Sequence, residues 1–228
     1  MNTPIRPLVL CCSGHDPGGG AGIHADIEAV GANGAHALTA ITAHTVQDTQ
    51  DVVRVVAADP EILKAQIETL LADSAIAAIK IGLLAEAAQI ALLRSVIEKT
   101  KVAVVLDPIL RAGGGTNLAT ASLQTALVTQ LLPLTHVLTP NAAEARRLTQ
   151  RESVEDCGKA LLDSGVKHVL ITGGDEPGAI VSNYWCSEKN SQRFEWPRLA
   201  ASFHGAGCTL AAALAALLAR GLDIEAAR

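Results

Sequence analysis

Two glycine-rich segments of the sequence have the composition of phosphate-binding loops. The first, Ser13 to Gly22, lies between a short apolar run and a stretch with helical spacing of apolar residues. The second, His204 to Thr209, precedes an alanine-rich run. Glycine lets a backbone approach a ligand closely, and the N–H groups at a helix N-terminus favour an anion. The alternatives are a tight strand–helix turn for the first segment and a glycine-rich helix start beside a buried cysteine for the second.

Cys208 is the cysteine whose surroundings indicate chemistry. A helix beginning in the second segment would favour a thiolate through its macrodipole, so we expect a lowered pKa and raised reactivity. The five cysteines have irregular spacing and no C-x-x-C pair, which argues against a disulfide framework and a structural zinc site. The others are expected to be small buried hydrophobic residues: Cys11, Cys12, Cys157 and Cys186.

Two carboxylates follow apolar runs and could bind a metal. Asp107 ends the run at 104–106, and Glu144 begins a helical stretch just after another short strand. Ligands of open α/β sheets gather at the carboxyl ends of the strands, so these side chains could meet there. Mg²⁺ takes one or two carboxylates together with phosphates. Each residue alone also fits a turn or a helix cap, and the scattered histidines are expected to be surface or core residues rather than metal ligands.

Alternating strands and helices must position these residues. Such alternation predicts βαβ units, a mostly parallel sheet with helices on both faces, and a single domain over residues 1–228. A polar stretch between two late extended segments predicts a hairpin. The expected strands are 8–12, 37–43, 52–56, 77–81, 102–106, 136–138, 166–171, 179–185 and 193–196, and the expected helices are 21–34, one starting at Pro60, 85–100, 120–132, 142–148, 154–164 and 208–220.

The composition excludes several classes of protein. The chain has 228 residues and a formal charge of -5 with only 2% aromatic residues, so it lacks the basic face and the stacking residues of a nucleic-acid binder. Hydrophobic residues make up 49%, too many for a disordered chain. We find no run of about 18 apolar residues and no signal peptide before Pro7, so we expect no membrane span. We therefore expect a compact cytoplasmic protein acting on a small molecule.

Six ordered motifs give the chain a resemblance that covers nearly its whole length. It resembles the hydroxymethylpyrimidine/phosphomethylpyrimidine kinases of thiamine biosynthesis, within the ribokinase-like superfamily. Cysteine at position 208, where most ribokinase-like enzymes carry aspartate, favours this family or its pyridoxal-kinase-like relatives over sugar kinases. The motifs are Ser13 to Asp26, Ile41 to Thr49, Lys80 to Gly82, Leu106 to Pro108, Thr139 to Ala145 and His204 to Leu210.

The resemblance implies a fold, a reaction and a set of site residues. The fold would be three-layer α/β/α. The reaction would be ATP-dependent phosphorylation of 4-amino-5-hydroxymethyl-2-methylpyrimidine and of its monophosphate, in a cytoplasmic homodimer that uses Mg²⁺. The implied residues are Asp26 and Gln47 bonding the pyrimidine, Gly14, Leu83 and Ile109 lining its pocket, Cys208 as base or positioner, the amides of Gly205, Ala206 and Gly207 on the phosphoryl group, Asn141, Thr172 and Gly174 at the nucleotide, and Asp107 and Glu144 at Mg²⁺.

Two departures from the family's pattern remove lysines. Thr172 stands where the family usually has the lysine of Lys-Gly-Gly, and residues 112–115 lack the lysine that often follows Asp-Pro. The sequence therefore leaves open a pyridoxal/pyridoxine-type kinase using the same site, and a pyrimidine-binding protein with weakened ATP use. A dinucleotide-dependent oxidoreductase rests only on Gly20-x-Gly22-x-x-Ala25, a weak signal.

Overall fold

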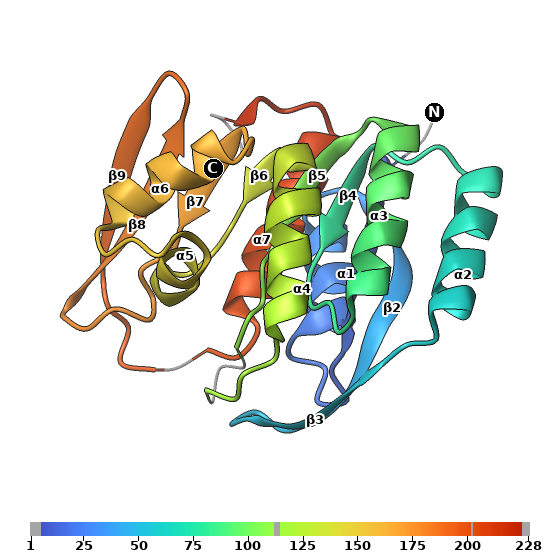
Figure 1. The fold of residues 1–228 in the computed structure, drawn as a ribbon, viewed down its shortest axis with the longest axis horizontal. Helices are drawn as coiled ribbons and strands as arrows, with labels where there is room; N and C mark the ends of the chain where they lie inside the picture. The colour runs from blue at the N-terminus through green and yellow to red at the C-terminus, as the bar shows by residue number, and fades with distance from the viewer. Residues whose placement is uncertain (1–5, 112–114, 202, 225–228) are drawn as a thin grey trace.

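One twisted sheet organises the chain (Figure 1). The computed structural model describes residues 6–111, 115–201 and 203–224. Among them the strand order is β3-β2-β1-β4-β5-β6-β7-β8-β9, with β3, β8 and β9 antiparallel to their neighbours and the others parallel. The strands are β1 (Leu8–His15), β2 (His36–Gln47), β3 (Val52–Ala57), β4 (Ala78–Ile81), β5 (Ala103–Leu106), β6 (Val137–Leu138), β7 (His168–Ile171), β8 (Ile180–Ser187) and β9 (Ser191–Pro197).

Helices cover both faces of this sheet, which confirms the three-layer α/β/α architecture. Figure 1 shows α1 and α7 behind the sheet and α2 to α6 in front of it. Among the described residues, no helix is long and apolar enough to cross a membrane. The helices are α1 (Gly22–Ala32), α2 (Pro60–Asp73), α3 (Ala87–Thr100), α4 (Ala121–Ala126), α5 (Ala142–Thr149), α6 (Val154–Asp163) and α7 (Ala206–Ala219).

Side chains of the central strands alternate between the two cores. On β1, Val9 and Cys11 pack with α1 and α7, whereas Leu10 and Cys12 pack with α2 and α3. A strand that is buried on both faces reads as a continuous apolar run, which is why the sequence shows no polar alternation here. Buried alanines let α7 lie close to the strands: Ala211, Ala212, Ala215 and Ala216.

The predicted elements differ from the structure mainly at their ends. β1 continues to His15 because its last residues still pair with β2. The predicted helix 120–132 is α4 followed by a π-helical turn at Leu127–Leu131 and a 3₁₀ turn at Leu132–Leu134, where Pro133 lacks the N–H that a continuing helix needs. The last helix begins at Ala206 rather than at Cys208, so Cys208 lies in its first turn.

The order of the strands reverses between β1 and β4. The chain first builds outward through β2 and β3, then returns to add β4 beside β1 and continues in the other direction. Ligands of open α/β sheets bind at the carboxyl ends of strands at such a switch point. Three of the motifs lie at this edge: the Ser13 segment starts in the last residues of β1, Gly82 follows β4 and Asp107 follows β5.

Gly158 on α6 offers a test of how tightly this helix packs on β8, and Gly31 on α1 offers the control. A Cβ at Gly158 would lie 2.8 Å from Cys186 Sγ and 3.0 Å from Tyr184 Cε1, whereas a Cβ at Gly31 would meet nothing within 4 Å. We predict that Gly158→Ala lowers the free energy of unfolding by about 1–3 kcal/mol through overpacking. Gly31→Ala, the matched control, should raise it by about 0.5–1 kcal/mol. Urea unfolding measures both, and equal effects would contradict this packing.

Candidate active site

The carboxylate of Asp16 joins the two glycine-rich segments. Asp16 Oδ1 accepts the N–H of Gly18 at 2.8 Å. Asp16 Oδ2 accepts the N–H groups of Gly20 and Ala21, and it lies 2.9 Å from His204 Nε2 in the second segment. Gly205 has a φ of +79°, and a Cβ there would lie 1.9 Å from the carbonyl oxygen of Gly20. The second segment therefore packs directly on the first, and position 205 requires glycine.

Asp16 stays ionised although it is buried. Burial alone would raise the pKa of this carboxyl group. Hydrogen bonds from the side chains of Gln47 and His204, and from the N–H groups of Gly18 and Ala21, outweigh burial and lower the pKa to about 2. The side chain is thus an acceptor of hydrogen bonds at any ordinary pH.

A buried ion pair lies behind the first segment. Lys80 Nζ is 2.6 Å from Asp26 Oδ1, and neither side chain is exposed. Ser13 Oγ donates to Asp26 Oδ2 at 2.6 Å and accepts from Lys80 Nζ at 2.9 Å. A Cβ at Gly82 would lie 2.6 Å from Ser13 Oγ and 2.8 Å from Lys80 Nζ, which explains the glycine of the Lys-Ile-Gly motif. Both oxygens of Asp26 are thus engaged within the protein, and its bond to a pyrimidine stays a prediction.

Asp107 and Cys208 lie in front of this pair and interact with it. Burial raises the pKa of Asp107 to about 6, although Lys80 and a hydrogen bond from the Cys208 thiol act in the opposite direction. Burial also raises the pKa of Cys208 to about 12, against the opposing effect of Lys80. The prediction of a lowered thiol pKa is therefore wrong, because the cost of burying a thiolate exceeds the effect of the helix N-terminus.

Glu144 closes the site from the side of α5. Its Oε2 accepts the N–H of Asn141 at 3.1 Å while Asn141 Oδ1 accepts the N–H of Glu144 at 2.8 Å, which is a capping box. Its Oε1 accepts the N–H of Leu110 at 3.0 Å. Burial and then the charge of Asp107 raise the pKa of Glu144 to about 8. The two carboxylates therefore interact electrostatically, and their binding of a metal stays a prediction.

These carboxylates fit Mg²⁺ as a partner. Burial raises both pKa values first, and for Glu144 the charge of Asp107 adds to it; a divalent cation would favour the ionised form of both carboxylates. Within the described residues, no three His, Cys, Asp or Glu side chains form a metal cluster. Mg²⁺ needs only one or two carboxylates when phosphates and water complete its shell.

The predicted pocket residues lie beside this centre. A Cβ at Gly14 would lie 2.9 Å from Leu83 Cδ2, so the two residues are in contact. Ile109 packs against a small cluster that contains Cys208. The structure thus places Gly14, Leu83 and Ile109 around the carboxyl ends of β1, β4 and β5, and their lining of a substrate pocket stays a prediction.

The predicted nucleotide residues form a separate part of the edge. Asn141 and Thr172 pair through a short parallel bridge after β6 and β7. The carbonyl oxygen of Gly174 accepts from Arg198 at 2.9 Å. Asp175 accepts the N–H of Ala143 at 2.9 Å and so occupies the start of α5. The lysine-free stretch at 112–114 lies outside the described residues.

Residues with evident structural importance were absent from the predicted site. Asp16, Lys80 and His204 each lie within one of the six motifs, but the residue types and spacing alone indicate no chemical role for them. Lys80 carried a signal of its own, because a lone lysine inside an apolar strand requires a buried partner. Nothing in the spacing of Asp16 and His204 reveals that they meet.

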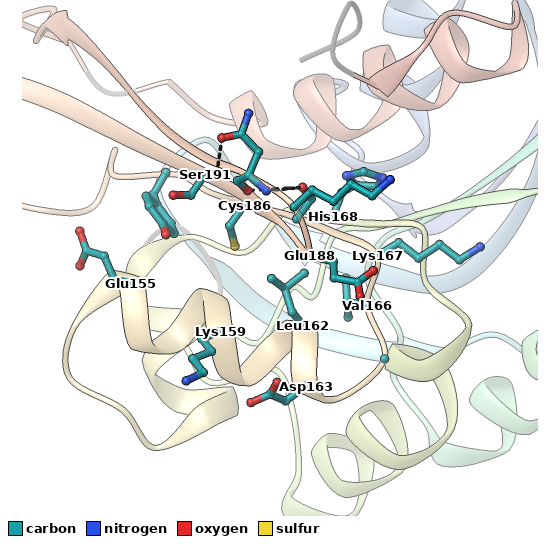
Figure 2. A pocket seen from close by; sticks show the side chains of 15 residues that line it. Glu155, Lys159, Leu162, Asp163, Val166, Lys167, His168, Cys186, Glu188 and Ser191 are labelled. Atoms are coloured by element: carbon teal, nitrogen blue, oxygen red, sulfur yellow. Dashed lines mark hydrogen bonds between the residues drawn. The ribbon is translucent and has the colours of Figure 1, made fainter.

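A broad hollow of about 1120 Å³ lies elsewhere, between α6 and the turn of the β8–β9 hairpin. Figure 2 shows charged side chains around it, among them Glu155, Lys159 and Asp163. The hollow lies at the amino end of β7, where residues 166–168 line it. The predicted site residue Thr172 follows the carboxyl end of the same strand. None of the predicted site residues lines this hollow, and they lie at the opposite edge of the sheet.

The chain is similar to kinases over most of its length. The sequence pattern of one family, phosphomethylpyrimidine kinase, matches residues 16–228. The chain is 34% identical over 227 residues to a hydroxymethylpyrimidine/phosphomethylpyrimidine kinase of Rhizobium meliloti, which covers 96% of this chain and 85% of that protein. It is 37% identical over 224 residues to the Salmonella typhimurium protein of the same description, covering 94% and 84%.

Solved structures of two kinds of vitamin kinase have this fold. An ADP complex of Bacillus subtilis pyridoxal kinase superposes with a TM-score of 0.89 at 28% identity, covering 97% of this chain and 87% of that one. A phosphomethylpyrimidine kinase from Clostridium difficile superposes with a TM-score of 0.84 at 30% identity, covering 97% and 94%.

We predict that Lys80→Met destabilises the protein by about 3–5 kcal/mol, because it leaves the Asp26 carboxylate buried without its cation. The double variant Lys80→Met/Asp26→Leu removes both charges and should recover most of this loss. Urea unfolding of the two variants and the wild type checks the prediction. A single variant as stable as the wild type would refute the assignment of a tight buried pair.

We also predict that Asp16 makes stability depend on acid. Its pKa is about 2 in the folded protein against an ordinary 3.8, so its stabilising effect is present above pH 4 and is lost as the pH falls toward 2. The shift corresponds to about 2 kcal/mol at neutral pH. The difference in unfolding free energy between the wild type and Asp16→Asn should therefore shrink by about 1 kcal/mol between pH 5 and pH 3. A difference that is constant over this range would contradict it.

Proposed function

The chain belongs to the phosphomethylpyrimidine kinase family, and on that premise we propose that it phosphorylates 4-amino-5-hydroxymethyl-2-methylpyrimidine and then its monophosphate, with ATP as donor. These are the two steps that give the pyrimidine diphosphate of thiamine biosynthesis. Relatives named as kinases for both steps support this, and so does one named as a bifunctional thiamine biosynthesis protein.

One juxtaposition carries the proposal. The first turn of α7 lies beside Asp107, since a Cβ at Gly207 would be 3.7 Å from Asp107 Oδ2. The N–H groups of residues 206–208 open this helix and have no partner within it. Donors for a phosphoryl group therefore lie next to a carboxylate suited to a metal, at the edge where the predicted pyrimidine pocket lies.

The residues of this chain would act mainly by positioning. Phosphoryl transfer has a loose transition state, in which placement and charge stabilisation matter more than removal of a proton. The N–H groups at the start of α7 would stabilise charge on the transferring group. Cys208, protonated and hydrogen-bonded to Asp107, fits the role of a positioner of the substrate hydroxyl better than that of a base in the free protein.

We propose Asp107 and Glu144 as the residues that hold Mg²⁺, and Asn141, Thr172 and Gly174 as neighbours of the nucleotide. The metal would neutralise charge on the phosphates. The proposal also includes a homodimer in the cytoplasm, as the family resemblance implies.

A pyridoxal-type kinase is the second candidate. It is favoured by the solved structures, because a Staphylococcus aureus pyridoxal kinase in complex with AMP-PCP and pyridoxal superposes with a TM-score of 0.88 at 28% identity, covering 98% of this chain and 84% of that one. The same pocket residues would face either ring, so competition between the two substrates decides between the candidates.

We predict that the protein with Mg-ATP converts the pyrimidine alcohol to a monophosphate and the monophosphate to a diphosphate, and that pyridoxal is the poorer substrate. Chromatography of the products measures each step. Absence of product from either pyrimidine at any enzyme concentration would refute the proposal. Pyrimidine binding without ATP-analogue binding in calorimetry would instead indicate a binding protein.

Cys208→Ala should lower kcat about 10²- to 10⁴-fold while pyrimidine binding persists, because the thiol positions the reacting hydroxyl. Cys157→Ala is the control, since Cys157 is another buried cysteine, on α6 and outside the candidate site. Turnover of Cys208→Ala equal to that of the control would remove Cys208 from the mechanism.

A further inference from the structure

Helix α5 begins between two loops of the candidate site. Strand β6, which leads into this helix, lies between β5 and β7 in the sheet. The loop after β5 begins with Asp107 and the predicted pocket residue Ile109. The loop after β7 contains the predicted nucleotide residue Gly174. The helix therefore has one of these loops on either side of its first turn, and two successive arginines on it bind different loops.

Arg147 holds the loop after β5 at two places. Its Nη1 donates to Asn117 Oδ1 at 2.7 Å and to the carbonyl oxygen of Leu110 at 3.4 Å. Its Nη2 donates to the carbonyl oxygen of Ala119 at 3.1 Å. Its Nε donates to Gln124 Oε1 on α4 at 3.1 Å, which fixes the plane of the guanidinium group. The first and the last described parts of this loop are thus tied to one side chain.

Arg146 holds the loop after β7 through an ion pair. Its Nη1 and Nη2 donate to the two carboxylate oxygens of Glu176 at 2.7 and 2.9 Å, and its Nε donates to the carbonyl oxygen of Glu152 at 2.9 Å. A half-exposed ion pair usually contributes little, but a bidentate pair of fixed geometry is the exception. Asp175, beside Glu176, accepts the N–H of Ala143 at 2.9 Å. The loop is therefore joined to α5 at two successive residues.

The composition of the loop after β7 makes its placement important. Thr172 stands where the resemblance leads us to expect a lysine, and residues 172–178 contain no lysine or arginine. Apart from the Thr172 hydroxyl, the donors that this loop offers are backbone N–H groups, whose direction depends on the conformation of the loop. A misplacement of about 1 Å near a reacting group costs up to about 10²-fold in rate.

We propose that Arg146 and Arg147 are positioning residues that act on different substrates. Arg147 places the loop that begins at Asp107 and Ile109, and it thereby determines how well the pyrimidine binds. Arg146 places the loop around Gly174, and it thereby determines how well the nucleotide binds. The inference rests on the proposed function, which assigns the two loops to the two substrates. Each arginine acts through the loop that it holds and not by contact with a substrate.

The test replaces each arginine by lysine, which keeps the charge but cannot form the planar set of hydrogen bonds. In Arg147→Lys we expect the KM for the pyrimidine alcohol to rise about 3- to 10-fold, as the loss of one hydrogen bond predicts, and the KM for ATP to stay within about twofold. In Arg146→Lys we expect the reverse. Arg151→Lys changes an exposed arginine beyond the end of α5 and is the control, in which both KM values should equal those of the wild type.

Variants of the loop residues break the same contacts from the other side. Asn117→Ala removes an acceptor of Arg147 and should raise the KM for the pyrimidine alcohol. Glu176→Gln breaks the bidentate pair and should raise the KM for ATP. Neither residue is buried, so these variants cover the case in which an arginine variant does not fold. A variant that leaves the KM of its own substrate unchanged, or that raises both KM values equally, would overturn the inference.

Hydrogen exchange distinguishes failure of the inference from failure of the proposed function. If the wild type phosphorylates neither pyrimidine, the proposed function fails, and exchange still shows which loop each arginine holds. The N–H groups of Leu118 and Glu176 donate to carbonyl oxygens within their own loops at 3.0 and 3.2 Å. We expect the Leu118 N–H to exchange at least about tenfold faster in Arg147→Lys alone, and the Glu176 N–H in Arg146→Lys alone. Exchange that is unchanged, or that is faster in both loops of each variant, contradicts separate roles for the two arginines.

Discussion

The edge of the sheet that carries the candidate active site depends on a lysine buried in the middle of the parallel strands. A buried ammonium group must be paired and hydrogen-bonded, because transfer of an isolated charge from water costs several kcal/mol or more. Lys80 meets this requirement through Asp26 and Ser13, which come from α1 and from the end of β1. The pair thus fixes α1 against the sheet at the point where the strand order reverses. Its positive charge also opposes the effect of burial on Asp107 and Cys208.

The two glycine-rich segments are in close backbone contact at this edge of the sheet. The first and second glycine-rich segments touch at Gly20 and Gly205, where a Cβ would overlap a carbonyl oxygen. The Asp16 carboxylate accepts hydrogen bonds from the N–H groups of Gly18, Gly20 and Ala21, which would otherwise need water as a partner. Glycine in these segments therefore serves packing between loops as much as access for a phosphate. The two interpretations offered by the sequence, a tight turn and an anion-binding loop, are not exclusive.

The sequence predicted the fold better than the chemistry of individual side chains. Alternating apolar runs determine the strands, and the α/β/α layers follow because buried parallel strands need helices on both faces. The ends of elements depend on tertiary contacts that no local pattern encodes, such as strand pairing at His15 and the packing of Gly205 on Gly20 just before Ala206. The acidity of Cys208 was predicted from its place at a helix start, but it is governed by burial, which only the folded chain defines. The meeting of Asp16 with His204, which are 188 residues apart, is likewise a property of the tertiary structure.

The distribution of charge also bears on which form of the nucleotide the proposed site accepts. The chain is acidic, with a formal charge of -5, and Thr172 stands where the sequence resemblance leads us to expect a lysine. Lys80 is fully buried against Asp26, so its charge is compensated inside the protein and not at the phosphates. With pKa values of about 6 and about 8, Asp107 is largely ionised at neutral pH and places negative charge at the same edge, whereas Glu144 is largely protonated there until a cation displaces its proton. A free polyphosphate would be repelled there, and neutral N–H donors alone would not offset that repulsion. Nucleotide that arrives with its divalent cation brings the neutralising charge with it, so the metal complex is the form that this arrangement of residues favours.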